Sequence, residues 1–173
     1  METVLELRQS ANKNLRIAEH MLTVTLPLVQ DSKLLIGIAE NVFLGFSNTL
    51  SALVYYERKY KRIPPYHDNF DSKHRMLNAK IIPRYGLSKE YAVSMVKIKE
   101  IVAKHKKSPM AFAKKDKFVI CDDGYQTETL TAQKLKYFLD TAKRFQSDVN
   151  KITSSHENIF NVRRLLHKKK SGF

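Results

Sequence analysis

Apolar residues recur at helical spacing from the start of the chain. Between residues 4 and 26 they form a single stripe made of Ala11, Leu15, Ala18, Leu22 and Leu26. Residues three or four positions apart share one face of a helix, so this stripe predicts a first helix with one buried side. Pro27 is predicted to end or kink that helix, because proline lacks a backbone N–H and its ring crowds the preceding turn.

A second predicted helix runs to about Tyr60 and is apolar over most of its surface. Asp31 or Ser32 is expected to cap its start, since a short polar side chain can accept the free backbone N–H groups of a first turn. The polar positions form only a narrow strip, made of Glu40, Asn48, Ser51 and Tyr55. A helix with so little polar surface is predicted to lie at the centre of the fold, covered by neighbours on more than one side.

Residues 34–56 of this second helix are also long enough to cross a bilayer. Glu40 would then lie in hydrocarbon, where an acidic side chain costs several kcal/mol. A buried helix of a soluble protein is therefore favoured, and we expect no membrane span. The opening METVLELRQS lacks the runs of a signal peptide, and the single Cys121 cannot form an intrachain disulfide. These features favour a cytoplasmic protein.

The rest of the chain is predicted to be mainly helical as well. A short helix follows a cap at Asp68 and runs from about residue 70 to 80, until Pro83 and Gly86 make a turn. Ser88 is predicted to cap a longer helix ending in KHKK, whose cations suit the carbonyl end of a helix. Thr131 is predicted to cap a final long helix.

Three local patterns complete the set of predicted elements. Ser108 and Pro109 in SPMAF have the cap and first-position chemistry of a short helical turn. Ser154 and Glu157 have capping-box spacing, which predicts a further helix running into RRLLHKKK. KFVIC and YQTETL flank an Asp-Gly turn, so residues 117–130 are predicted to form a small hairpin.

These elements predict a mainly all-α fold. We expect an antiparallel helical bundle of four long helices, with one short helix and one small β-hairpin insertion. A chain of 173 residues suits one core, so residues 1–166 are predicted to form a single domain. Residues 167–173 are predicted to be a basic, frayed tail.

Positive charge is concentrated in the second part of the chain. Residues 1–57 contain four Lys or Arg and six Asp or Glu, whereas residues 58–173 contain 27 and 11. A concentrated positive field attracts polyanions, which favours RNA or DNA as partner, then an anionic membrane, then an acidic protein. Cys121 stands beside Asp122 and Asp123, and neighbouring anions raise a thiol pKa, so a structural role is favoured over a reactive one.

Tyrosines alternate with cations in YYERKYKRIPPYH and in PRYG. Aromatic rings stack on unpaired bases while Lys and Arg hold phosphates, so this alternation favours RNA over DNA. The predicted nucleic-acid-binding residues are Arg58, Lys59, Tyr60, Lys61, Arg62, Tyr66, Arg75, Arg84, Lys104, Lys106, Lys107, Arg163 and Arg164. The predicted function is thus a basic RNA-binding helical module, and one alternative is a helical adaptor that docks an acidic protein.

A possible metal-ligand set lies in HDNFDSKH. His67, Asp71 and His74 supply two imidazoles and a carboxylate at spacings that one helix start could bring together. The acids also have an ordinary explanation, because Asp68 can cap the helix and Asp71 can offset its positive end. We therefore favour no metal and expect no cofactor.

Arg62 and His67 in RIPPYH are separated by four residues, and this spacing resembles the arginine–four residues–histidine motif of HEPN domains. HEPN domains are small all-helical bundles that include many ribonucleases, so the resemblance extends to the architecture. It implies metal-independent cleavage of RNA, with Arg62 holding the scissile phosphate and His67 transferring a proton. It also implies a homodimer in which two motifs meet. These side chains suit the two roles, since a guanidinium group forms bidentate hydrogen bonds with phosphate and an imidazole titrates near neutral pH.

The residues around this motif leave a second interpretation open. Ile63 stands where the family usually has a polar residue, and Pro64 and Pro65 preclude regular helix. On this interpretation Arg62 and His67 belong to a basic binding platform at the end of a helix, without catalysis. The ribonuclease is therefore the enzyme alternative to the binding module.

Overall fold

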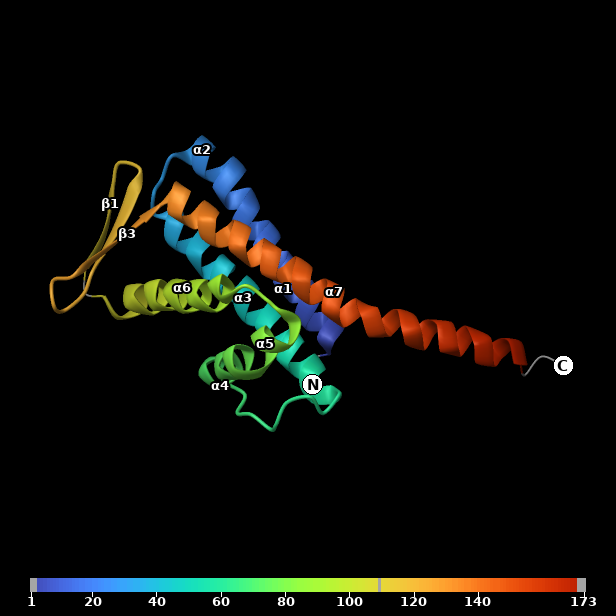
Figure 1. Cartoon of the computed structure of the whole chain (residues 1–173). Helices are drawn as coiled ribbons and strands as arrows, with labels where there is room; N and C mark the ends of the chain where they lie inside the picture. The colour runs from blue at the N-terminus through green and yellow to red at the C-terminus, as the bar shows by residue number, and fades with distance from the viewer. Residues whose placement is uncertain (1–2, 109, 171–173) are drawn as a thin grey trace.

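The computed structural model describes residues 3–108 and 110–170, with side chains to residue 155. The chain is mainly helical and carries one small antiparallel sheet (Figure 1). Its first half comprises α1 (Val4–His20), the π-helical turn η1 (Met21–Thr25), α2 (Leu26–Val29) and α3 (Leu34–Lys59). Its second half comprises α4 (Phe70–Met76), the π-helical turn η2 (Leu77–Ile81), α5 (Ile82–Tyr85), α6 (Lys89–Lys107), β1 (Met110–Lys114), β2 (Lys117–Cys121), β3 (Thr127–Thr131) and α7 (Ala132–Lys170).

The predicted central helix is confirmed as α3. Its buried residues occur on several faces, and it packs against α1, α4, α6 and α7. Within the described part of the chain α3 is the one helix long and apolar enough to cross a membrane, and 44% of its most apolar window is buried. Packing of this kind is what a core helix requires, because every apolar face needs a partner.

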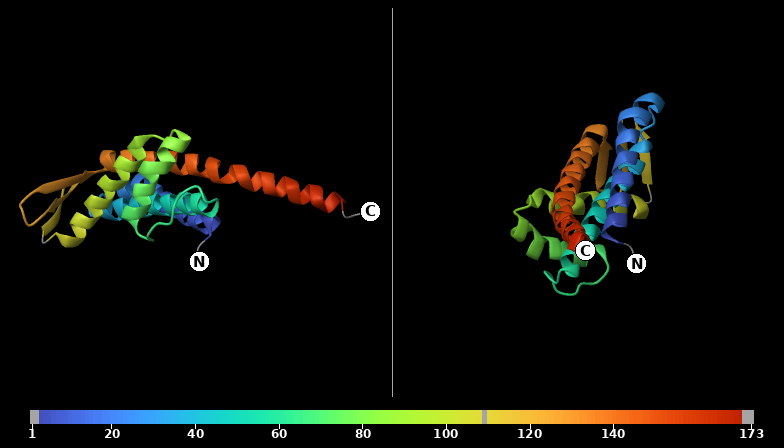
Figure 2. Two further views of the ribbon diagram at one scale, coloured as in Figure 1. Left: turned by 60° about the horizontal axis from the view of Figure 1, so that its bottom comes forward. Right: turned by 90° about the vertical axis from the view of Figure 1, so that its right-hand side faces the viewer.

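The long helices do not all alternate in direction. α1 runs antiparallel to α3, and α7 lies beside both and runs in the direction of α3 (Figure 1). α6 crosses this group, and α4 and α5 lie near the end of α3 (Figures 1 and 2). The antiparallel arrangement predicted for four long helices therefore holds for α1 and α3 but not for α3 and α7.

The two helices continue past Pro27 and Pro83 and end at Val29 and Tyr85, so the first ends just after its proline and the stop predicted near Pro83 and Gly86 is confirmed at Gly86. In each case a π-helical turn precedes the proline: Leu26 donates its backbone N–H to Met21, and Ile82 donates to Leu77. A wider turn leaves room for the proline ring, which would otherwise collide with the carbonyl of the preceding turn. The chain leaves the helical path only afterwards, at Gln30 and at Gly86, both with positive φ.

The cap predictions are partly confirmed. Ser88 accepts the Glu90 backbone N–H at 3.2 Å, and Thr131 accepts that of Lys134 at 3.1 Å. The cap of α4 is Asn69, which accepts from Ser72, rather than Asp68. At the start of α3, Asp31 Oδ1 accepts the Lys33 backbone N–H at 2.9 Å, as predicted for one of the two residues, whereas the Ser32 hydroxyl donates to the Lys115 carbonyl.

The sheet has three antiparallel strands in the order β1-β2-β3. The predicted hairpin is confirmed as β2 and β3, with Phe118 opposite Leu130 and both buried. Residues 110–112, predicted as helix within SPMAF, instead form β1 and pair with β2. An unpaired β2 edge would leave backbone groups without partners, so the sheet context outweighs the local Ser-Pro signal.

The last helix is continuous from Ala132 to Lys170, and the break predicted at Ser154 is absent. Thr153 and Ser155, on either side of Ser154, donate their hydroxyls to the carbonyls of Val149 and Ile152, as such side chains do within a continuous helix. α7 extends well past the other helices (Figure 1). Residues 167–170 of the predicted tail continue this helix, and residues 171–173 lie outside the described residues.

Two glycines of α3 provide a test of the α1–α3 packing. A methyl group at Gly45 would lie 2.6 Å from Leu15 Cγ, whereas one at Gly37 would lie 3.2 Å from the flexible end of Met21. We expect Gly45→Ala to lower the free energy of unfolding by about 1–3 kcal/mol, because Leu15 is buried and has little room to move. Gly37→Ala is the matched control and should change it by less than about 1 kcal/mol. Urea denaturation measures both, and equal effects would contradict the described contact.

Candidate functional site at the end of α3

A buried carboxylate organises the end of α3. The Glu57 side chain has no solvent exposure, and both of its oxygens are occupied. Oε1 accepts the Tyr85 hydroxyl at 2.5 Å and lies 3.3 Å from Arg62 Nη1, and Oε2 pairs with Arg84. A buried charge is tolerated only when it is paired and hydrogen-bonded, and here two guanidiniums and a phenol meet that need.

Local backbone geometry brings these residues together. After α3 the chain turns sharply: Lys61 has a φ of 55°, and the Arg62 N–H donates to the Glu57 carbonyl at 2.9 Å. Arg84 Nη2 also donates to the Arg62 carbonyl at 2.9 Å. The end of α3, the loop that follows and α5 are thus held together by one ionic cluster, which we call the Glu57 cluster: Glu57, Arg62, Arg84 and Tyr85.

The Glu57 cluster opens onto a cleft of about 430 Å³. Its lining residues are Tyr56, Arg62, Arg84, Tyr85, Ile152 and Ser155. The Arg62 guanidinium lies over the Tyr60 and Tyr56 rings, 5.2 and 5.7 Å from their centroids. Burial and the hydrogen bond to Glu57 raise the pKa of Tyr85 to about 12, so its phenol stays protonated and continues to donate at neutral pH.

A second cleft, of about 840 Å³, lies between α3, α4 and the loop of residues 60–69. We call it the α3–loop cleft. It is lined by Leu7, Ser47, Asn48, Ser51, Tyr55, Arg58, Pro65, Tyr66, Asp68 and Lys73. Lys73 Nζ donates to Ser51 Oγ at 3.0 Å and pairs with Asp68 Oδ1 at 2.6 Å. Burial raises the pKa of Tyr66, and the nearby Asp68 carboxylate adds to that effect.

The structure gives Arg62 and His67 different surroundings. Arg62 belongs to the Glu57 cluster, whereas His67 is exposed on the loop and donates its backbone N–H to Ser72 Oγ at 3.1 Å. Ile63, between them in sequence, is buried. Neither described cleft is lined by both residues of the predicted catalytic pair.

The candidate metal ligands are engaged elsewhere in the fold. Asp71 pairs with Lys99 at 2.6 Å, which lowers the pKa of the Asp71 carboxyl. His74 Nε2 lies 2.9 Å from the Ala92 carbonyl, and its ring stacks on Phe70. Within the described ranges, no group of three His, Cys, Asp or Glu residues is placed to hold a metal ion.

The predicted nucleic-acid-binding residues fall into separate groups. Those from Arg58 to Tyr66, together with Arg84, surround the end of α3, and Arg75 is exposed on α4. Lys104, Lys106 and Lys107 lie at the end of α6 beside the sheet, away from the end of α3 (Figure 1), and Lys104 pairs with Asp122. The backbone of Arg163 and Arg164 belongs to the extended part of α7, and their side chains lie outside those described.

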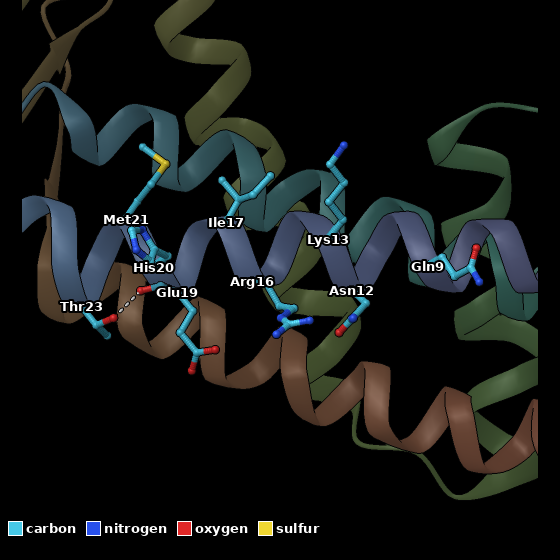
Figure 3. A pocket seen from close by; sticks show the side chains of 9 residues that line it. All are labelled: Gln9, Asn12, Lys13, Arg16, Ile17, Glu19, His20, Met21 and Thr23. Carbon is cyan, nitrogen blue, oxygen red and sulfur yellow. Dashed lines mark hydrogen bonds between the residues drawn. The ribbon is translucent and has the colours of Figure 1, made fainter.

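A further cleft of about 680 Å³ runs along α1 and η1. All nine lining residues come from this one helical segment, and their side chains point to both sides of it (Figure 3). Glu19 pairs with Lys143 at 2.6 Å, and Thr23 donates to the Glu19 carbonyl. Its polar groups therefore do not converge on one point, as those of a ligand site do.

Sequence reasoning did not identify Glu57, Tyr85, Ser51 or Lys73 as members of a site. Glu57 had a detectable signal, because it continues the apolar stripe of Leu50 and Leu53 with a charge. A charged residue in a core stripe needs a buried partner. Tyr85 and Lys73 gave no such signal, since only the chain path places them beside α3.

No family model, curated protein or solved structure matches the chain. Function is therefore inferred from the described residues themselves.

Replacing the Glu57 carboxylate tests the cluster. We expect Glu57→Gln to lower the free energy of unfolding by about 2 kcal/mol, because two guanidiniums lose their buried counter-charge. The loss is moderate because the Arg62 and Arg84 side chains are 29% and 36% exposed and can turn to water. Glu100→Gln, at an exposed position of α6, is the control and should have little effect. Urea denaturation of both variants decides the matter, and equal stability of the two would contradict a structural role for Glu57.

The raised pKa of Tyr85 predicts a loss of stability at alkaline pH. The folded state favours the protonated phenol, so its stabilising contribution is complete below pH 10.0, the ordinary pKa, and is lost as the pH rises through about 12. Tyr91, which donates to Asp148 and also has its pKa raised to about 12, contributes in the same range. Melting temperatures measured from pH 9 to 12 should therefore fall less steeply for Tyr85→Phe than for the wild type. Tyr125→Phe, at an 85% exposed position, should retain the wild-type slope.

Proposed function

We propose that the protein binds nucleic acid, RNA in preference to DNA, through the end of α3 and the loop that follows it. We call this surface the α3-end platform, and it consists of Arg58, Lys59, Tyr60, Lys61, Arg62, Tyr66 and Arg84. The observation that carries the proposal is the gathering of these cations and tyrosines around one helix end, between two clefts.

The charge of the platform suits a phosphate backbone. Arg58, Lys59 and Lys61 are exposed. Two further platform cations, Arg62 and Arg84, pair with the buried Glu57. An excess of exposed cations attracts a polyanion and releases its counterions on binding.

The tyrosines give the platform a preference for unpaired bases. Tyr60 and Tyr66 are half-buried, and each is anchored on the protein side. The Tyr60 ring packs edge-on against Tyr56, with centroids 4.9 Å apart. Fixed rings offer flat faces on which bases stack, and such stacking is a feature of single-strand recognition.

Pairing with Glu57 gives Arg62 and Arg84 fixed positions. A held guanidinium loses little freedom when it meets a phosphate, so the cluster serves binding by preorganisation. A binding role for Arg62 is favoured over a catalytic one, because His67, its proposed catalytic partner, is exposed on the loop and lines neither of the two clefts. The ribonuclease and the adaptor for an acidic protein are therefore kept as alternatives, which the binding experiment below distinguishes.

The salt dependence of binding tests the platform. We expect the double variant Lys59→Ala/Lys61→Ala to bind a single-stranded RNA oligonucleotide more weakly. Its slope of log K against log salt should be shallower by about 1.4, since each lost phosphate contact on a single strand contributes about 0.7. Lys13→Ala/Lys33→Ala removes the same charge from exposed sites on the first half of the chain and should keep the wild-type slope. Fluorescence anisotropy over a salt series measures both.

Further measurements on the same protein distinguish the RNA-binding module from the adaptor and from the ribonuclease. Tighter binding of an acidic peptide than of RNA or duplex DNA would favour the adaptor. Cleavage of RNA without added metal that is lost in His67→Ala would favour the ribonuclease. An equal loss of slope in both double variants would show that net charge alone, and not the platform, drives binding.

A further inference from the structure

The α3–loop cleft has a polar wall where a core helix would ordinarily be apolar. Ser47, Ser51 and Tyr55 follow one another at four-residue spacing, so their hydroxyls line a single face of α3. Tyr66 of the loop and Lys73 of α4 add a phenol and an ammonium group to the lining. Hydroxyl and amino groups from two helices and a loop thus converge on one space, as polar groups do in ligand sites.

Lys73 contributes a largely buried cation to the lining of this cleft. Its side chain is only 16% exposed, yet its carboxylate partner Asp68 is 89% exposed. A counter-ion that lies largely in water is a weak partner, because solvent screens the pair. The Lys73 ammonium, which Ser51 also holds at 3.0 Å, is therefore placed to exchange Asp68 for an incoming anion at low cost.

The rest of the lining suits a flat, partly apolar group attached to that anion. Tyr55, Pro65 and Tyr66 contribute aromatic and apolar surface, and Arg58 adds a second cation whose Nη1 is held by the Ile63 carbonyl at 3.2 Å. A volume of about 840 Å³ is within the range of small-molecule sites and much larger than a bare phosphate needs.

We propose that the α3–loop cleft binds one nucleotide unit, with its phosphate at Lys73, Ser51 and Arg58 and its base against Tyr66. The proposal rests on the proposed function, since it identifies the cleft as the place where the α3-end platform takes up a single unpaired nucleotide. It adds a pocket, formed by Ser51 and Lys73, to a surface otherwise defined by exposed cations. The group that binds is a nucleoside phosphate, and either a free nucleotide or a nucleic-acid strand can supply it.

Isothermal titration calorimetry with adenosine 5′-monophosphate tests the cleft directly. We expect binding with a Kd below about 1 mM, and binding of adenosine or inorganic phosphate alone at least about tenfold weaker. Lys73→Met should weaken binding of the monophosphate at least about tenfold, as expected when a charged hydrogen-bond donor is lost. Lys99→Met is the matched control, because Lys99 also ties α4 to the fold, through Asp71, but does not line the cleft. It should bind the monophosphate like the wild type.

A smaller substitution guards against misfolding of the Lys73 variant. Ser51→Ala removes one hydroxyl and should weaken binding about threefold to tenfold while the melting temperature stays near that of the wild type. Failure of the wild type to bind the monophosphate, or unchanged binding in Lys73→Met and Ser51→Ala, would overturn the assignment of the cleft. Equal affinity for inorganic phosphate and the monophosphate would overturn the role given to Tyr66.

Competition with RNA keeps this proposal separate from the proposed function. If the monophosphate displaces a labelled RNA oligonucleotide, both hold and the strand is the source of the nucleotide. If RNA binds but the monophosphate neither binds nor competes, the cleft proposal fails and the platform stands. If the monophosphate binds and RNA does not, the platform fails and the cleft is a site for a free nucleotide.

Discussion

The paired carboxylate of Glu57 is the constraint on which the candidate site at the end of α3 depends. Its side chain is fully buried on the central helix, and Arg62, Arg84 and Tyr85 supply the partners that a buried carboxylate needs. Those partners come from a loop and from a short helix, and buried apolar residues such as Ile63 and Ile82 hold the same segments against the core. The charge on the core helix and this apolar packing together fix the path of the chain from residue 60 to residue 85.

Pairing with Glu57 separates the basic residues of this region into two groups. The arginines that bind Glu57 are fixed and partly neutralised, whereas Lys59 and Lys61 are exposed beside them. A surface with fixed and mobile cations can hold a polyanion at defined points and still adapt to its shape. It is less suited to proton transfer, because Arg62 is fixed by the cluster while His67 lies exposed on the loop.

Periodicity predicted the helical class, the central helix and the hairpin, because these features depend on residues close in sequence. The errors occurred where tertiary context outweighed a local signal. The helices continue past Pro27 and Pro83 to Val29 and Tyr85, since a π-helical turn absorbs each ring, and residues 110–112 pair with β2 as a strand instead of forming a helical turn. The candidate site was predicted only in part: YYERKYKRIPPYH and PRYG marked the platform, but no local pattern shows that Arg84 and Tyr85 reach Glu57 or that Lys73 reaches Ser51.

The exposed edge of the sheet links the charge of the protein to its behaviour in solution. β1 is an edge strand, exposed throughout, and it carries Met110 and Phe112. Such an edge can pair with another extended chain, but β1 ends in Lys114, Lys115 and Lys117 follow closely, and the whole chain has a net charge of +14. Like charge keeps copies of the protein apart. If the protein binds a polyanion as proposed, neutralisation of this charge would remove the repulsion, and colloidal stability and the proposed binding would then depend on the same lysines and arginines.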